Sequence, residues 1–173
     1  MTKRFALLAA LIGAVFLCTG ERATAQVSLN ETPAAISVGA GWYDLIHQDD
    51  EAADFRLEYR HGEDFLYLKP WSGLEVTTDG SVWGGIGALV DITFFDRVVL
   101  TGSFAPGLWV EGGGKDLGHV VELRSQVELG YQFDNRTRLA LAFSHASNAH
   151  LDGTNPGVEV LSLYYHLPLD VLF

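Results

Sequence analysis

Four side chains near the end of the sequence have the types and the spacing of a hydrolase site. His145, Ser147 and Asn148 fall within one segment, and Glu159 follows after a turn-rich stretch. Residues two apart in a β-strand point to the same side, so His145 and Ser147 would stand together on one face. If the next strand runs antiparallel beside them, Glu159 reaches the other edge of the imidazole. A nucleophile, a base and a group that orients the base form a triad for acyl transfer. The spacing alone also fits a surface serine and histidine beside a loop.

The first 25 residues follow the pattern of an export signal. Lys3 and Arg4 precede an apolar run over residues 5–17, and the small-residue sequence Ala23-Thr24-Ala25 follows. The run is shorter than the roughly 20 residues that a membrane-spanning helix needs. We therefore expect residues 1–25 to be a signal peptide that is removed, and residues 26–173 to form one domain.

The overall charge argues against one large class of partners. The chain has 22 acidic side chains against 11 Lys and Arg, and its formal net charge is −11. Nucleic-acid binding requires a basic footprint, so no nucleic-acid partner is expected. Cys18 is the only cysteine and lies within the expected signal peptide, so the exported domain offers no disulfide or thiolate metal site. The histidines are scattered, and we expect neither a metal nor a cofactor.

Beyond residue 25 the sequence alternates between apolar and polar residues with the period of β-strands, and nothing reads as a long helix. Asp79-Gly80 and Asp134-Asn135 mark two tight hairpin turns. The sequence predicts eight antiparallel strands, over residues 34–46, 53–61, 65–78, 81–92, 94–106, 117–133, 136–148 and 157–169.

Eight antiparallel strands fit two barrel architectures. A soluble barrel has its apolar face inside, whereas a membrane barrel has it outside, against lipid. The polar face of the predicted strands carries both signs of charge, as in Arg56, Glu58 and Arg124, which suits a filled interior of paired charges. The chain also ends in Phe173, and a terminal aromatic residue is a familiar feature of bacterial outer-membrane barrels. The sequence therefore predicts an all-β fold, an eight-stranded antiparallel transmembrane β-barrel.

The predicted barrel determines where the candidate triad lies. With short turns on the periplasmic side, both termini are periplasmic and the loop between the last two strands is extracellular. His145 and Ser147 then continue the lipid-facing apolar row of their strand, and Glu159 begins the lipid-facing row of the next. Because ionisable groups at lipid depth are costly, we expect them to act there, in a site that faces the outer leaflet of the bacterial outer membrane.

The segment Phe143-Ser144-His145-Ala146-Ser147-Asn148, followed by Gly157-Val158-Glu159, resembles the signature of the PagL family, the outer-membrane lipid A 3-O-deacylases. The stretches 68–75 and 84–87 are also similar to the family. The resemblance implies an eight-stranded barrel with His145 as base, Ser147 as nucleophile and Glu159 as the acid that orients the base. It also implies Asn148 in the oxyanion hole, no cofactor, and lipopolysaccharide, through its lipid A, as the substrate.

Other functions remain open on the sequence alone. An esterase acting on phospholipids would use the same Ser–His chemistry, a non-catalytic small barrel would serve structure or adhesion, and a soluble periplasmic barrel would bind a ligand. A homodimer is possible, and nothing in the sequence tests it. Lys115 is the only Lys or Arg of the predicted extracellular loops, so the groups that would recognise the lipid A phosphates are not identified.

Overall fold

The computed structural model describes residues 26–172, and the fold is almost entirely β-structure. The predicted signal peptide, residues 1–25, and Phe173 lie outside the described residues. No helix within residues 26–172 is long and apolar enough to cross a membrane. The elements are β1 (Val27–Leu29), β2 (Ala35–Tyr43), β3 (Ala52–Arg60), β4 (Lys69–Thr77), β5 (Val82–Phe94), β6 (Val98–Val110), β7 (Val121–Gln132), β8 (Arg138–Ser147), β9 (Val158–Pro168) and the short helix α2 (Leu169–Leu172).

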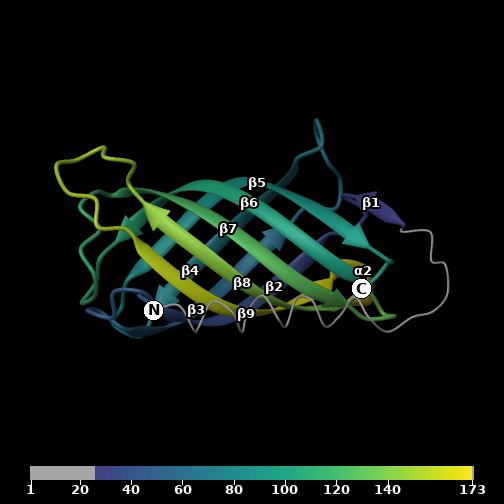
Figure 1. Cartoon of the computed structure of the whole chain (residues 1–173), viewed down its shortest axis with the longest axis horizontal. Coiled ribbons are helices and arrows are strands. Elements are labelled where there is room, and N and C mark those ends of the chain that lie inside the picture. The colour runs from purple at the N-terminus through teal and green to yellow at the C-terminus, as the bar shows by residue number, and fades with distance from the viewer. Residues whose placement is uncertain (1–25, 173) are drawn as a thin grey trace, which may run out of the picture.

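Eight of the strands close into a ring in which neighbouring strands are antiparallel (Figure 1). The order is β2-β3-β4-β5-β6-β7-β8-β9, and β9 pairs with β2 to close the ring. The predicted eight-stranded antiparallel barrel is therefore confirmed. In Figure 1 the β8–β9 loop lies at the left end of the barrel, which we call the far end, and β1 and α2 lie at the right, which we call the terminal end.

A ninth strand, β1, lies outside the ring of eight and was not predicted. It pairs with residues 92–94 of β5, next to the part of β5 that pairs with β4. The predicted strand 65–78 begins too early, because Phe65 and Leu68 close a tight turn before β4. Within that turn Leu66 and Tyr67 have φ angles of 53° and 66°, which a strand does not accommodate. β1 occupies the length of β5 that β4 leaves unpaired.

Both tight turns predicted from the sequence are present. Between β4 and β5, Gly80 has a φ angle of 85°, and the N–H of Thr77 donates to the carbonyl of Ser81 at 3.0 Å. Between β7 and β8, the N–H of Phe133 donates to the carbonyl of Thr137 at 2.8 Å. Longer loops follow β2, β6 and β8, over residues 44–51, 111–120 and 148–157, and these three lie at the far end. The connection after β3, over residues 61–68, is as long as the first of them and lies at the terminal end.

The outer wall of the barrel is apolar and its interior is charged. Outward-facing Phe55 and Leu141 are each 54 % exposed, whereas Glu58, Arg124 and Glu128 are each 1 % exposed inside the ring. A soluble barrel has the opposite arrangement, so the distribution identifies a transmembrane barrel and rules out the soluble ligand-binding alternative. A closed ring also leaves no strand edge with unpaired backbone groups in hydrocarbon.

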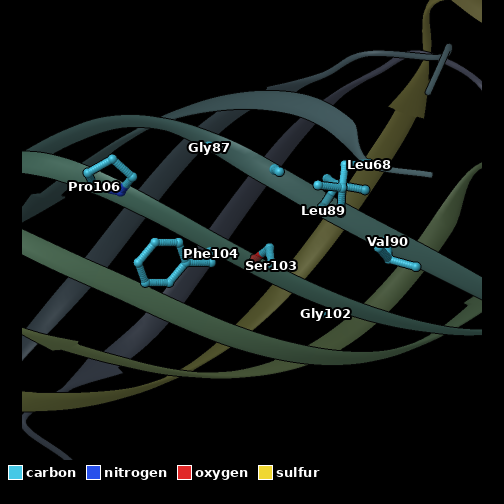
Figure 2. A pocket seen from close by; sticks show the side chains of 9 residues that line it. Leu68, Gly87, Leu89, Val90, Gly102, Ser103, Phe104 and Pro106 are labelled. Atoms are coloured by element: carbon cyan, nitrogen blue, oxygen red, sulfur yellow. The ribbon is translucent and has the colours of Figure 1, made fainter. Parts of the chain in front are cut away.

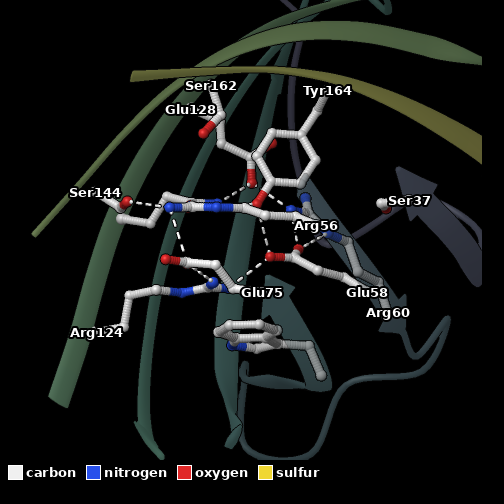
Figure 3. A network of polar contacts seen from close by, with 12 residues as sticks. Ser37, Arg56, Glu58, Arg60, Glu75, Arg124, Glu128, Ser144, Ser162 and Tyr164 are labelled. Atoms are coloured by element: carbon white, nitrogen blue, oxygen red, sulfur yellow. Dashed lines mark hydrogen bonds and ion pairs between the residues drawn. The ribbon is translucent and has the colours of Figure 1, made fainter. Parts of the chain in front are cut away.

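The buried charges are linked across the barrel (Figure 3). Arg124 donates to Glu58 at 2.6 Å and to Glu75 at 3.1 Å, and Arg56 contacts Glu75 at 3.0 Å. The guanidinium carbon of Arg124 lies 4.2 Å from the ring centroid of Trp83. Pairing of this kind offsets the desolvation cost of burying ions. Groups that act on molecules outside the barrel must then lie on the outer wall or in the loops.

An apolar groove lies on the outer wall where β5 meets β6 (Figure 2). Its volume is about 610 Å³, and Ala88, Val90, Gly102 and Phe104 are among its lining residues. Leu68, from the turn before β4, lines it as well. None of the lining residues is titratable, so the groove offers packing space and no acid–base chemistry.

Candidate active site

The histidine and the carboxylate of the predicted triad meet on the outer wall. His145 of β8 and Glu159 of β9 are direct partners in the β8–β9 ladder, and Nδ1 of His145 lies 2.9 Å from Oε1 of Glu159. An ionised carboxylate only accepts hydrogen bonds, so the Nδ1–H donates and Nε2 keeps a free lone pair. A neutral imidazole held in this tautomer has the geometry of a general base.

Residue alternation explains why both side chains face outward. His145 follows exposed Leu141 and Phe143 in the outward row of β8, and Glu159 precedes exposed Leu163 in the outward row of β9. The His145 side chain is 45 % exposed and that of Glu159 is 13 % exposed. The carboxylate is thus shielded, while the imidazole remains open to a reactant.

Ser147 lies on the same face of β8 as His145 and is the last residue of that strand. Its Oγ makes no hydrogen bond to the imidazole within residues 26–172. The structure therefore joins two of the three predicted triad residues by a hydrogen bond and places the serine beside them on the same face. A change of the χ1 rotamer redirects a serine Oγ, and catalytic hydrogen bonds commonly tighten only when substrate binds.

A second outward-facing serine flanks the imidazole from the neighbouring strand. Ser125 of β7 is the direct ladder partner of His145 and is exposed. It interrupts the otherwise apolar outward row of β7, which includes Val127 and Leu129. The imidazole of His145 therefore has one serine on its own strand and another on the strand beside it.

Gly157, at the end of the β8–β9 loop, leaves space beside the imidazole. Its φ angle is 65°, a left-handed conformation that favours glycine. A Cβ built on Gly157 would lie 2.9 Å from Cε1 and 3.6 Å from Nε2 of His145. The sequence places Gly157 at the start of a predicted strand, and its contact with the histidine depends on the fold of the preceding loop.

The side chain of Asn148 links two far-end loops, 111–120 and 148–157, by hydrogen bonds. Its side-chain amide donates to the carbonyl oxygens of Leu117 and Thr154, both at 2.8 Å, and its Oδ1 accepts the N–H of His150 at 2.9 Å. Asn148 is buried, and both of its amide hydrogens are used by these carbonyls. Its role in an oxyanion hole therefore stays a prediction.

The loop 44–51 packs against Glu159 from the side of β2, a contact that sequence spacing did not indicate. The N–H of Leu45 donates to the carbonyl oxygen of Glu159 at 3.0 Å. Asp44 accepts from Nζ of Lys115 at 2.6 Å and from the N–H groups of Asp49 and Asp50 at 3.0 and 3.1 Å. Burial acts to raise the pKa of Asp44, but these hydrogen bonds outweigh it, so the pKa lies below its ordinary value. The carboxylate is therefore ionised at neutral pH and holds the loop in place.

The polar groups brought together here are those of acid–base and nucleophilic chemistry. In the part of the chain that the structure describes, no group of three or more His, Cys, Asp or Glu side chains is arranged to hold a metal ion.

The closed ring, the apolar wall and the charged interior define the class of the protein, an integral β-barrel of the outer-membrane type. The sequence model of a family described as lipid A 3-O-deacylase (PagL) matches residues 37–168. The chain belongs to this PagL family, a family of hydrolases that modify lipid A, and its fold indicates localisation in the outer membrane.

The solved structures that match the chain include two outer-membrane proteins. The crystal structure of the outer membrane enzyme PagL has 18 % sequence identity and a TM-score of 0.65, over 78 % of this chain and 99 % of that one. The backbone structure of the Yersinia pestis outer membrane protein Ail in a phospholipid bilayer nanodisc has 15 % identity and a TM-score of 0.47, over 78 % of this chain and 99 % of that one. The likeness to the PagL crystal structure shows a shared fold. No curated protein matches the chain by sequence.

Proposed function

We propose that the protein hydrolyses the ester-linked 3-hydroxyacyl chain at the 3 position of lipid A, with Ser147, His145 and Glu159 as its catalytic triad. The observation that carries the proposal is the 2.9 Å hydrogen bond between His145 and Glu159 on the outer wall. Ionisable groups near lipid are costly, so their presence on an apolar wall calls for a function. Membership of a lipid A 3-O-deacylase family supports the choice of substrate.

In the proposed reaction, Oγ of Ser147 attacks the ester carbonyl while Nε2 of His145 takes the hydroxyl proton. Glu159 holds the Nδ1–H and stabilises the imidazolium that forms. When the tetrahedral intermediate collapses, Nε2 returns its proton to the leaving sugar oxygen, and an acyl-enzyme remains. His145 then deprotonates a water molecule, which releases the 3-hydroxy fatty acid and restores the serine.

The developing oxyanion needs a donor, and one such hydrogen bond contributes roughly 3–4 kcal/mol to transition-state stabilisation. Asn148 is proposed for this role because the resemblance of its motif to the PagL family implies it. For Asn148 to act, one amide hydrogen must leave the carbonyl of Leu117 or Thr154 and turn to the substrate.

The orientation of the barrel is part of the proposal. We assign the far end to the cell exterior, because outer-membrane barrels have longer extracellular than periplasmic loops and three of the four longer connections lie at that end. The triad then faces the outer leaflet, and the acyl chains of the substrate pack along exposed Leu141, Phe143 and Leu163.

A second candidate, a phospholipid esterase, is favoured by the charge of the far-end loops. Lys115 is the only Lys or Arg in the loops 44–51, 78–81, 111–120 and 148–157, and its ammonium is bound to Asp44 at 2.6 Å. These loops therefore offer no free Lys or Arg to the phosphates of lipid A. A zwitterionic phospholipid has no net charge to neutralise and would not need one.

Mass spectrometry of lipid A from a Gram-negative host tests the proposal. We expect wild type and the matched control Ser125→Ala to remove one 3-hydroxyacyl mass, and Ser147→Ala to remove none. Removal by Ser147→Ala would reject Ser147 as the nucleophile. Intact lipid A with every folded variant, together with fatty acid release from phosphatidylethanolamine, would favour the phospholipid esterase. No release from either lipid would leave a non-catalytic barrel.

A further inference from the structure

The carboxylate of Glu159 has one oxygen that the proposed triad does not use. Oε1 accepts from His145, whereas Oε2 is buried and has no hydrogen-bond partner within residues 26–172. The loop 44–51 brings a second imidazole close to it, since Nδ1 of His47 lies 3.7 Å from Oε2. This distance is within ion-pair range but beyond a hydrogen bond. Two imidazoles therefore face opposite oxygens of one carboxylate.

The loop that carries His47 is held against Glu159 at several points. The N–H of Leu45 donates to the carbonyl of Glu159 at 3.0 Å, and the N–H of Gln48 donates to the carbonyl of Asp44 at 3.0 Å. The Asp44 carboxylate is bound to Lys115 at 2.6 Å. His47 therefore lies in a short turn that is held by hydrogen bonds at Asp44, Leu45 and Gln48. This turn positions the His47 imidazole next to the carboxylate of Glu159.

The charged groups that face His47 are two carboxylates. Its Nδ1 lies 3.9 Å from Oδ1 of Asp44 and 3.7 Å from Oε2 of Glu159. Asp44 already has the ammonium of Lys115 as its partner, so Glu159 is the carboxylate whose oxygen still lacks a donor. The two other far-end loop histidines have different neighbours: Nδ1 of His119 accepts the N–H of Val121, and His150 lies near Asn155.

We propose that His47 is a positioning residue of the triad, which holds Oε2 of Glu159 so that Oε1 stays on Nδ1 of His145. The inference rests on the proposed function. A carboxylate bound at one oxygen can still rotate about its last side-chain torsion, which is broad and roughly two-fold. The imidazole of His47, 3.7 Å from the other oxygen, restricts that rotation, and a fixed carboxylate keeps the imidazole of His145 in the tautomer that can accept the serine proton. His47 does not touch the reacting ester.

Four proteins purified in detergent test the role: wild type, His47→Ala, His47→Asn and the matched loop control His150→Ala. An asparagine places an amide N–H close to the position of the histidine Nδ1, so His47→Asn retains a donor without an imidazole. We expect His47→Ala to lower kcat for lipid A deacylation on the order of tenfold, as for groups that orient catalytic side chains. KM should be unchanged, and His47→Asn and His150→Ala should keep the wild-type kcat. A wild-type kcat in His47→Ala, a change confined to KM, or no rescue by His47→Asn would each overturn the proposal.

Imidazole ¹⁵N NMR of the same four proteins gives a readout that does not require lipid A turnover. We expect His145 to be a single Nδ1–H tautomer in wild type, His47→Asn and His150→Ala, and a mixture of both tautomers in His47→Ala. A single Nδ1–H tautomer in His47→Ala would reject the positioning role. If wild type leaves lipid A intact, the proposed function fails, and the tautomer measurement still decides whether His47 positions Glu159.

Discussion

Nδ1 of His145 donates to Oε1 of Glu159 at 2.9 Å, between two residues that are direct partners in the β8–β9 ladder. The register of the ladder therefore sets the contact, and the intervening loop does not. A slip of one residue would turn one of the two side chains to the opposite face of the wall. The barrel therefore fixes the backbone positions of the pair, which an oriented base requires, and leaves only the side-chain torsions to be restrained.

Replacing the carboxylate should disable this base. In Glu159→Gln the side-chain amide can donate to Nδ1, which would leave the proton on Nε2 and remove the acceptor for the serine. We expect kcat for lipid A deacylation to fall by roughly 10²–10⁴ with little change in KM, by analogy with loss of the orienting acid in a serine protease triad. The control Glu51→Gln removes a far-end carboxylate that pairs with Trp42 and should keep wild-type kinetics. A kcat for Glu159→Gln within twofold of wild type would exclude Glu159 from the triad.

The loop 44–51 should loosen in acid. Because the folded-state pKa of Asp44 lies below its ordinary value, the ionised carboxylate stabilises the loop above the ordinary aspartate pKa of about 3.9. This stabilisation of the loop is lost as the pH falls below the ordinary aspartate pKa and then through the lower folded-state pKa of Asp44. We expect hydrogen-exchange protection of the Asp49 and Asp50 amides at pH 7 and its loss below about pH 4. In the control Asp44→Asn, protection of these two amides should not change in this way with pH. Protection of the wild-type amides that persists below about pH 4 would show that the Asp44 carboxylate does not hold the loop.

The interior network should matter far more to stability than ion pairs at the surface. Arg124→Ala leaves Glu58 and Glu75 buried with one cation fewer, and we expect a loss of about 3–5 kcal/mol in the free energy of unfolding. Arg97→Ala breaks an exposed pair with Asp134 and should have little effect. Urea unfolding in detergent micelles, followed by tryptophan fluorescence, measures both. Equal effects of the two variants would show that burial does not decide the strength of these pairs.

The strand pattern and the outward position of the His–Glu pair could be predicted from the sequence because both follow from period-two alternation. β1 has only three residues, too few for a readable alternation. The predicted start of β4 at residue 65 was wrong, because Leu66 and Tyr67 are left-handed and lie in a turn before the strand. Leucine and tyrosine are not residue types that mark a turn.

The parts of the site that lie in loops were beyond sequence reasoning. The contact of His47 with Glu159 joins residues more than a hundred positions apart and depends on how the loop 44–51 folds back. The burial of Asn148 depends on carbonyls of two different loops. Periodicity describes strands and carries no information about such contacts, so the sequence indicated the site only through the motif that contains His145, Ser147 and Glu159.

Two glycines on facing strands provide a last test of how tightly the wall is built. Between β5 and β6 the ladder pairs Gly85 with Gly107 and Ala88 with Phe104 but lapses between them, where Pro106 has no N–H to donate. A Cβ on Gly87 would overlap the carbonyl oxygen of Phe104, whereas a Cβ on Gly102 meets nothing within 4 Å.

We therefore expect Gly87→Ala to lower the free energy of unfolding by about 1–3 kcal/mol, because a rigid backbone cannot yield to the added methyl group. Gly102→Ala faces the open groove and should leave stability unchanged or raise it by up to about 1 kcal/mol, since alanine restricts the unfolded chain. Urea unfolding of both variants in detergent micelles measures the difference. If Gly87→Ala is as stable as Gly102→Ala, β5 and β6 are not packed as closely at this point as the structure has them.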